Sequence, residues 1–192
     1  MRLTTLLFAV LAATAAPAEL QAQLGEFHVG AIAGFGTADS YRAGGGVTIA
    51  VVPGRISFLG LRYVWQGGSD QTIAGNAQDF EVRTNSTTIA ADLGLQFPVG
   101  GAELVIGASL GTVRFHQEFV SASSATTEEV VAWEFMAAPS ITAYFRVGRF
   151  LIGPEFQWGL AGNPDFPVNL SHQGPLFNLR FVLPFEIDRI RQ

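Results

Sequence analysis

Eight stretches of this chain alternate between apolar residues and polar or small ones, and this period-two pattern constrains the fold more than any other feature of the sequence. In a β-strand successive side chains point to opposite faces, so alternation predicts strands with one apolar and one polar face. The clearest run, TIAADLGLQF, is apolar at Ile89, Ala91, Leu93, Leu95 and Phe97. The sequence therefore predicts an all-β chain.

The spacing of the alternating runs predicts the topology. Short turns at residues 52–55 (VPGR), 98–101 (PVGG) and 146–149 (RVGR) alternate with long polar connections at 67–79, 121–129 and 161–174. Short and long connections then fall at opposite ends of an up-and-down meander, as in barrels that cross a membrane. The predicted strands are 26–36, 41–52, 55–66, 81–97, 102–119, 130–146, 149–160 and 175–187.

Alternation alone does not say whether the apolar faces meet a core or a lipid. The polar faces carry charges of both signs at mid-strand, which would be costly in lipid but can pair across the narrow interior of an eight-stranded barrel. The residues predicted to form structural ion pairs in that interior are Arg62, Asp92, Glu134, Glu155 and Arg180.

The aromatic residues indicate that the apolar faces point outward. All three tryptophans fall near the long connections, with Tyr41 and Phe35 close by, while other aromatics fall beside the short turns. A membrane with two interfaces favours two such belts. The predicted belt residues are Trp65, Trp133, Trp158, Phe97 and Phe185.

One predicted strand changes phase. In 102–119 the apolar positions are even-numbered up to Leu110 and odd-numbered from Val113. A β-bulge near Gly111 would restore the phase and turn Arg114 inward.

The composition excludes several classes of protein. Only 14% of the 192 residues are charged while 48% are hydrophobic, whereas a soluble domain carries about 25% charged residues. The absence of cysteine excludes disulfides and thiolate metal sites. The net charge is −5 and no basic block occurs, so we expect no nucleic-acid partner.

The first residues resemble an export signal. Arg2 precedes an apolar stretch, residues 3–16, that is shorter than the ~20 residues a spanning helix needs. Small residues precede two cleavage points, after Ala18 and after Ala22. We therefore expect residues 1–22 to be a cleaved signal peptide and residues 23–192 to form the barrel.

This architecture resembles that of the small eight-stranded outer-membrane barrels, the OmpA- and OmpX-like group. The resemblance covers residues 23–192 and rests on the leader, strand count, connection lengths and aromatic belts, with no short diagnostic motif. It implies an antiparallel up-and-down transmembrane β-barrel in the outer membrane of a Gram-negative-type cell. It also implies outer-membrane lipids, lipopolysaccharide and the barrel-assembly machinery as partners.

The sequence offers no convincing catalytic, cofactor or metal site. The nearest approach to a hydrolase is Ser171–His172, but neighbouring strand residues point to opposite faces, and this pair falls in a predicted loop, where we expect a solvated histidine. His116 is interpreted as a polar rim residue and His28 as a filler of the barrel floor.

The predicted function is non-enzymatic: a structural or surface-interaction role through the loops at 67–79, 121–129 and 161–174. Eight strands leave room for side chains rather than a water channel, which argues against an open porin. The alternatives are a transport barrel for small hydrophobic molecules, a lipid-A-modifying enzyme and a soluble secreted β-barrel.

Overall fold

A computed structural model of the protein describes residues 25–74, 79–121 and 127–186. The expected signal peptide and its cleavage points lie outside these residues. The described part is a meander of nine strands, β1 (Glu26–Gly36), β2 (Gly44–Val52), β3 (Ser57–Gly67), β4 (Gln71–Ala74), β5 (Asp79–Val99), β6 (Ala102–Ser121), β7 (Thr127–Val147), β8 (Phe150–Ala161) and β9 (Gly174–Glu186).

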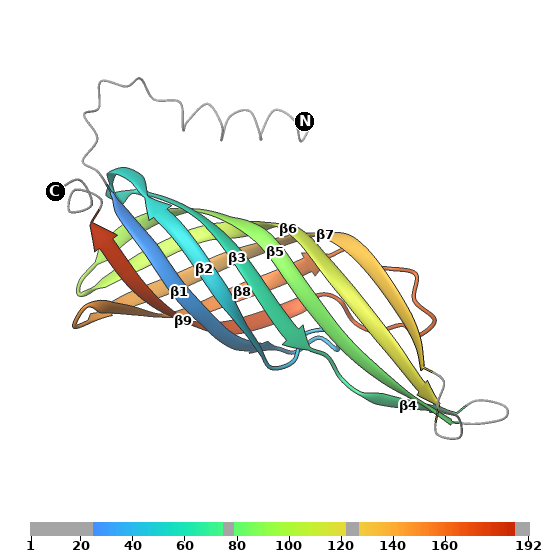
Figure 1. Cartoon of the computed structure of the whole chain (residues 1–192). Coiled ribbons are helices and arrows are strands. Elements are labelled where there is room, and N and C mark those ends of the chain that lie inside the picture. Colours follow the sequence, from blue (N-terminus) through green and yellow to red (C-terminus); the bar gives the residue numbers. More distant parts are fainter. Residues whose placement is uncertain (1–24, 75–78, 122–126, 187–192) are drawn as a thin grey trace, which may run out of the picture.

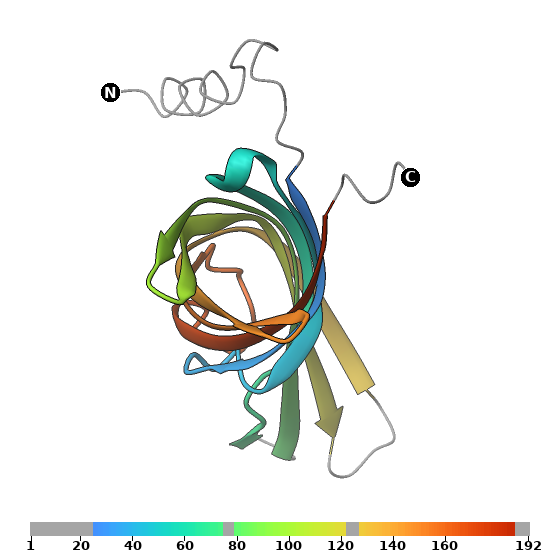
Figure 2. The same cartoon turned by 90° about the vertical axis from the view of Figure 1, so that its left-hand side faces the viewer.

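Eight of these strands close into an antiparallel barrel, which confirms the predicted fold class. Each barrel strand pairs with its neighbours in the chain, except that β3 pairs with β5 past β4, and β1 pairs with β9 from Glu26↔Glu186 to Gly36↔Leu176. The start of β1 and the end of β9 therefore lie at the same end as the short turns (Figure 1). Viewed along its axis the barrel is a closed ring (Figure 2).

All three short turns depend on glycine. Gly54, Gly100 and Gly148 have φ values of 63°, 60° and 63°, a left-handed conformation that residues with a β-carbon rarely adopt. The third turn contains a single 3₁₀ turn, η1 (Pro53–Arg55), which is the one helical segment within the described ranges. Among those residues no helix is long and apolar enough to cross a membrane.

Three features of the structure differ from the sequence-based predictions. β4, which pairs with the outer end of β5, lies inside the predicted 67–79 loop. β2 begins at Gly44 rather than Tyr41, and the Tyr41 side chain is fully buried in the barrel mouth instead of facing outward. β7 begins at Thr127, so Glu128 and Glu129 belong to a strand rather than to a loop.

The predicted bulge near Gly111 was wrong. The register of β6 with β5 and β7 runs without interruption from Ala102 to Val120. Val113 and Phe115 face the interior and are fully buried, and Arg114 faces outward. The apolar phase changes because the upper interior is apolar, not because the strand slips.

The outer surface of the barrel is an apolar band. Large apolar side chains with roughly half of their surface exposed occur on β1, β2, β3, β5, β6, β7, β8 and β9, including Val47, Leu61, Leu95, Ile106, Ile141, Phe156 and Phe181. An exposed apolar surface of this extent is typical of contact with lipid rather than water.

The strands β5, β6 and β7 are 21, 20 and 21 residues long, about twice the ~9–11 residues that a tilted strand needs to cross a membrane. Their ends therefore extend beyond the rest of the barrel, together with β4 (Figure 1). We call this extension, formed by β4 and residues 79–86, 115–121 and 127–132, the protruding sheet.

Candidate functional site

The middle of the barrel interior is filled by an ionic layer. Arg62 from β3 and Arg180 from β9 meet Asp92 from β5 and Glu155 from β8, and all four residues are at most 4% exposed. Two positive and two negative charges balance, as buried charges must if they are to remain ionised.

Arg62 is the centre of this layer. Its guanidinium donates to both carboxylate oxygens of Asp92 at 2.7 and 2.8 Å. It also donates to both oxygens of Glu155, at 3.0 and 3.2 Å, and to Oε1 of Gln157 at 2.8 Å. Forked pairing of this kind is the strongest geometry available to an arginine and a carboxylate.

Neutral residues complete the layer and connect six strands. Ser109 donates to Asp92 at 2.7 Å, while Thr142 and Asn178 donate to Glu155 at 3.2 and 3.0 Å. Arg180 donates to Asp92 at 3.0 Å and also to Glu155. The lumen is therefore crossed by hydrogen bonds at this level.

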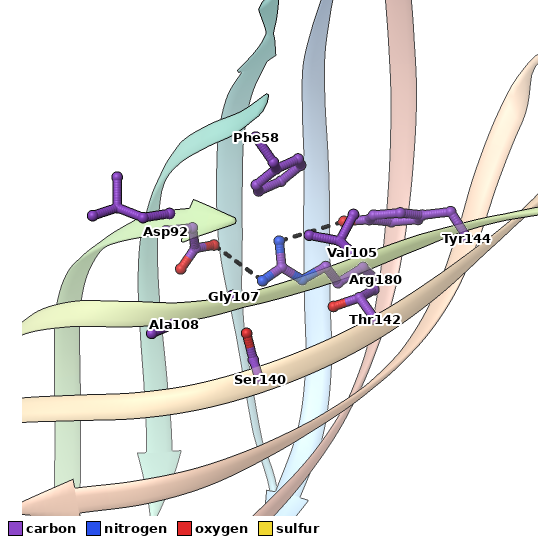
Figure 3. A pocket seen from close by; sticks show the side chains of 10 residues that line it. Phe58, Asp92, Val105, Gly107, Ala108, Ser140, Thr142, Tyr144 and Arg180 are labelled. Atoms are coloured by element: carbon purple, nitrogen blue, oxygen red, sulfur yellow. Dashed lines mark hydrogen bonds and ion pairs between the residues drawn. The ribbon is translucent and has the colours of Figure 1, made fainter. Parts of the chain in front are cut away.

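The floor of the barrel lies between the ionic layer and the short turns. Figure 3 shows Arg180 between Asp92 and the hydroxyl of Tyr144, with Phe58 beside it. The cavity between these side chains has a volume of about 10 Å³, enough for about one water molecule. Below it an apolar cluster closes the floor, formed by Ala50, Val52, Phe58, Val105, Tyr144, Leu151 and Val182.

The other predicted site residues lie apart from the ionic layer. Glu134 is on the inward face of β7 near the mouth, close to Gly162, and does not join the four-residue cluster. His28 is buried on the floor, 3.1 Å from Glu26. The predicted belt residues all have exposed outward side chains: Trp65, Trp133, Trp158, Phe97 and Phe185.

The mouth of the barrel is closed by residues 162–173, the connection between β8 and β9, which we call the cap. Phe166, Leu170 and His172 are buried, and the Gln117 amide inside the barrel donates to the carbonyl of Val168 at 3.1 Å. The cap packs on Tyr41, Val113, Phe115 and Met136, so the upper interior is an apolar core. In Figure 2 the connection is visible inside the ring.

The connection between β1 and β2 holds the cap in place. The Ser171 hydroxyl and backbone N–H donate to Asp39 Oδ2 at 2.8 and 3.2 Å, and the Ser40 backbone N–H donates to the Ser171 carbonyl at 3.2 Å. Ser40 Oγ and His172 Nδ1 are hydrogen-bonded at 2.6 Å. These contacts join residues 131 or 132 positions apart in the sequence, which is why no sequence signal pointed to them.

His172 is buried, so the prediction of a solvated histidine was wrong. Its ring lies 4.4 Å from the Phe115 ring and 6.0 Å from the Phe166 ring. Ser40 and His172 have the distance of a nucleophile and its base, but Ser40 is 0% exposed, which leaves no room for a substrate carbonyl. The hydrogen bond between Ser40 and His172 therefore fits a structural role, holding the cap on the β1–β2 connection.

The cap should loosen in acid. Burial lowers the pKa of His172 below its usual value of about 6.5, against an opposing effect of Asp39. The displaced cap then binds protons more readily than the closed cap, so the contribution of His172 to closure is complete above about pH 6.5 and is lost as the pH falls. Hydrogen bonds from Ser171 lower the pKa of Asp39, whose contribution is lost only at more acidic pH, below about 4.

We expect residues 162–173 to be cleaved several-fold faster at pH 5 than at pH 7.5 by a protease that is active at both values. The variant His172→Asn keeps a hydrogen-bonding group near Ser40 but cannot be protonated in this range, so its cleavage should depend much less on pH. Equal pH dependence in the two proteins would contradict the role of His172.

His116 lies on the outward face of the protruding sheet. Its Nδ1 is 3.0 Å from Asn85 Nδ2 and its Nε2 is 3.3 Å from Glu129 Oε2. The described residues contain no group of three or more histidine and acidic side chains placed to hold a metal ion.

Comparison with solved structures finds outer-membrane proteins that align over most of this chain. A major outer membrane protein from Thermus thermophilus aligns with a TM-score of 0.65 and 11% sequence identity, over 84% of this chain and 99% of that chain. Ail, the attachment invasion locus protein of Yersinia pestis, aligns with a TM-score of 0.47 and 10% identity, over 84% and 97% of the two chains. The N-terminal β-barrel domain of Pseudomonas aeruginosa OprF aligns with a TM-score of 0.47 and 16% identity, over 86% and 100%.

No protein-family model matches the chain, and no curated protein matches its sequence. The likeness to the Thermus protein, at this identity, concerns the fold alone. The protein has the closed eight-stranded architecture of the small outer-membrane β-barrels, as the pattern of strands and connections predicted.

Proposed function

We propose that this protein is a non-enzymatic barrel of the bacterial outer membrane, with a structural or surface-interaction role carried by its outer connections and the protruding sheet. The observation that supports this most directly is the filled lumen. The apolar floor, the ionic layer and the cap occupy the interior at three levels, so the surfaces left for contact are the outer band and the protruding sheet.

The dimensions of the outer band support the membrane part of the proposal. On β7, Trp133 and Phe145 are both outward and exposed, and twelve residue steps separate them. At about 3.3 Å per residue and a tilt of about 45°, this distance corresponds to about 28 Å along the membrane normal. A hydrocarbon layer of about 25–30 Å fits between two belts at this spacing.

The protruding sheet supports the surface part. It carries Asp79, Glu81, Glu118, Glu128 and Glu129 against a single arginine, Arg83, which pairs with Glu81 at 3.0 Å. An acidic surface beyond the apolar band favours basic partners.

The interior argues against the alternatives. A path for a small hydrophobic molecule would have to pass the ionic layer, where moving any one charge leaves another buried without its partner. A lipid-modifying enzyme would need an accessible nucleophile, and the Ser–His pair that the fold brings together is buried under the cap. A soluble barrel would leave the outer apolar band in water.

Two measurements test the proposal together. The membrane-extracted mature protein should migrate differently on a gel when boiled and unboiled, and the folded protein in a planar lipid bilayer should show no stable ion conductance. A variant that lacks residues 163–172 should remain non-conducting, because the ionic layer still crosses the lumen. Stable conductance of the intact protein would overturn the proposal in favour of transport, and recovery as a soluble protein without a mobility shift would overturn the membrane assignment.

A further inference from the structure

The register of β3, β5, β6 and β7 orders the outward side chains into rows from the apolar band to the protruding sheet. One row is apolar apart from a threonine: Tyr63, Ile89, Thr112 and Phe135. The next, one step outward, is Trp65, Thr87, Arg114 and Trp133. Beyond it come Asn85, His116 and Val131, and then Arg83, Glu118 and Glu129.

Arg114 therefore lies where the outer surface changes from apolar to charged. Its cross-strand neighbours are Thr87 on β5 and Trp133 on β7, and neither is acidic. Tryptophan rings favour the level of the lipid headgroups, and Trp133 is the direct cross-strand neighbour of Arg114, so Arg114 lies close to that level.

The other arginines of this part of the barrel already have protein partners. Arg62 and Arg180 are inside the barrel with Asp92 and Glu155, and Arg83 pairs with Glu81 on its own strand. On the outward face, the nearest positions diagonal to Arg114 are Asn85, Ile89, Val131 and Phe135, so its cross-strand surroundings within the described strands supply no carboxylate. Next to a headgroup layer, the anion that every phospholipid supplies is its phosphate.

We propose that Arg114, together with the Thr87 hydroxyl, binds the phosphate of a membrane lipid between Trp65 and Trp133. The planar guanidinium can donate two parallel hydrogen bonds to phosphate oxygens, and a cross-strand hydroxyl about 5 Å away can donate a third. The lipid's acyl chains then lie along the apolar row that contains Tyr63 and Phe135. This inference rests on the proposed membrane location and adds a ligand class and a site to it.

Quenching of tryptophan fluorescence tests the site, because two tryptophans lie in the same row. The Trp158→Phe variant is used, so that the fluorescence comes from Trp65 and Trp133. It is folded into phosphatidylcholine vesicles that contain a small fraction of brominated phosphatidic acid. A parallel sample contains the same fraction of brominated phosphatidylcholine. The phosphate of phosphatidylcholine is balanced by its own choline group, whereas that of phosphatidic acid is not. Binding of the phosphate by Arg114 should therefore make quenching by the anionic lipid about twofold to fivefold stronger than by the neutral one.

Two matched variants distinguish a specific phosphate site at Arg114 from a general electrostatic attraction of the protein for anionic lipid. Arg114→Gln should reduce the ratio to about one, whereas Arg83→Gln, which removes the same charge from the same face, should leave it nearly unchanged. An unchanged ratio in Arg114→Gln, or an equal loss in both variants, would overturn the proposal.

Two controls distinguish the sources of failure. Inorganic phosphate in the millimolar range should not reduce the preference; if it does, Arg114 binds a soluble anion and the lipid assignment is wrong. Only heat-modifiable protein is scored, so a chain that inserts but shows no preference contradicts the lipid site alone. A chain that never enters the vesicles contradicts the proposed membrane function as well.

Discussion

Replacement of Arg62 by methionine should destabilise the barrel more than any other single substitution inside it. The side chain would be lost from the centre of the ionic layer, and five acceptor contacts to Asp92, Glu155 and Gln157 would lose their donor. Removing one partner of a buried ionic network leaves uncompensated charge, at a cost of about 3–5 kcal/mol in the free energy of unfolding. Urea unfolding of the refolded barrel, followed by the heat-modifiable gel band, measures this loss.

The double variant Arg62→Met with Asp92→Asn provides the control. It restores the charge balance with Arg180 and Glu155, so it should recover a substantial part of the stability lost in the single variant. If Arg62→Met unfolds at the same urea concentration as the natural chain, the ionic layer does not stabilise the fold.

Replacement of Leu61 by arginine should have the second largest effect, although its neighbour in the sequence is Arg62. Leu61 is 57% exposed in the middle of the outer band, whereas Arg62 is 4% exposed inside the barrel. An arginine on the lipid face of a barrel near the membrane midplane costs about 2–4 kcal/mol. Membrane assembly of Leu61→Arg should therefore drop sharply, as measured by the fraction of heat-modifiable protein in the membrane.

Leu61→Phe keeps an apolar side chain at this position and should assemble as well as the natural chain. Equal assembly of Leu61→Arg and Leu61→Phe would mean that the position does not face hydrocarbon. The outer band would then have to be covered by something other than lipid.

The strand pattern of this protein could be predicted from the sequence because alternation is a local property. β1 was predicted with its observed bounds, and the bounds of β6, β8 and β9 that fall in the described ranges differ by at most two residues. The short turns were also recognised, because glycine and proline mark turns wherever the rest of the chain lies.

The errors arose where distant residues meet. Val113 and Phe115 interrupt the alternation of β6, which suggested a change of phase. They are apolar because they face the interior, where they pack against the cap, residues 162–173. Tyr41 resembles a belt aromatic, and it is buried because it packs in the same core, with its ring 6.0 Å from that of Phe115. Glu134 lies on the inward face of β7, above the level at which the four other interior charges pair.

The amino-acid order dictates an all-β chain with one apolar face per strand, because side-chain direction in a strand follows from the position in the sequence. Only barrel closure brings Arg62 to Glu155, 93 positions away, and Ser40 to His172, 132 positions away. Whether a charge is paired or a histidine is buried depends on these approaches, since electrostatic energy and solvation are properties of neighbours in space rather than in sequence.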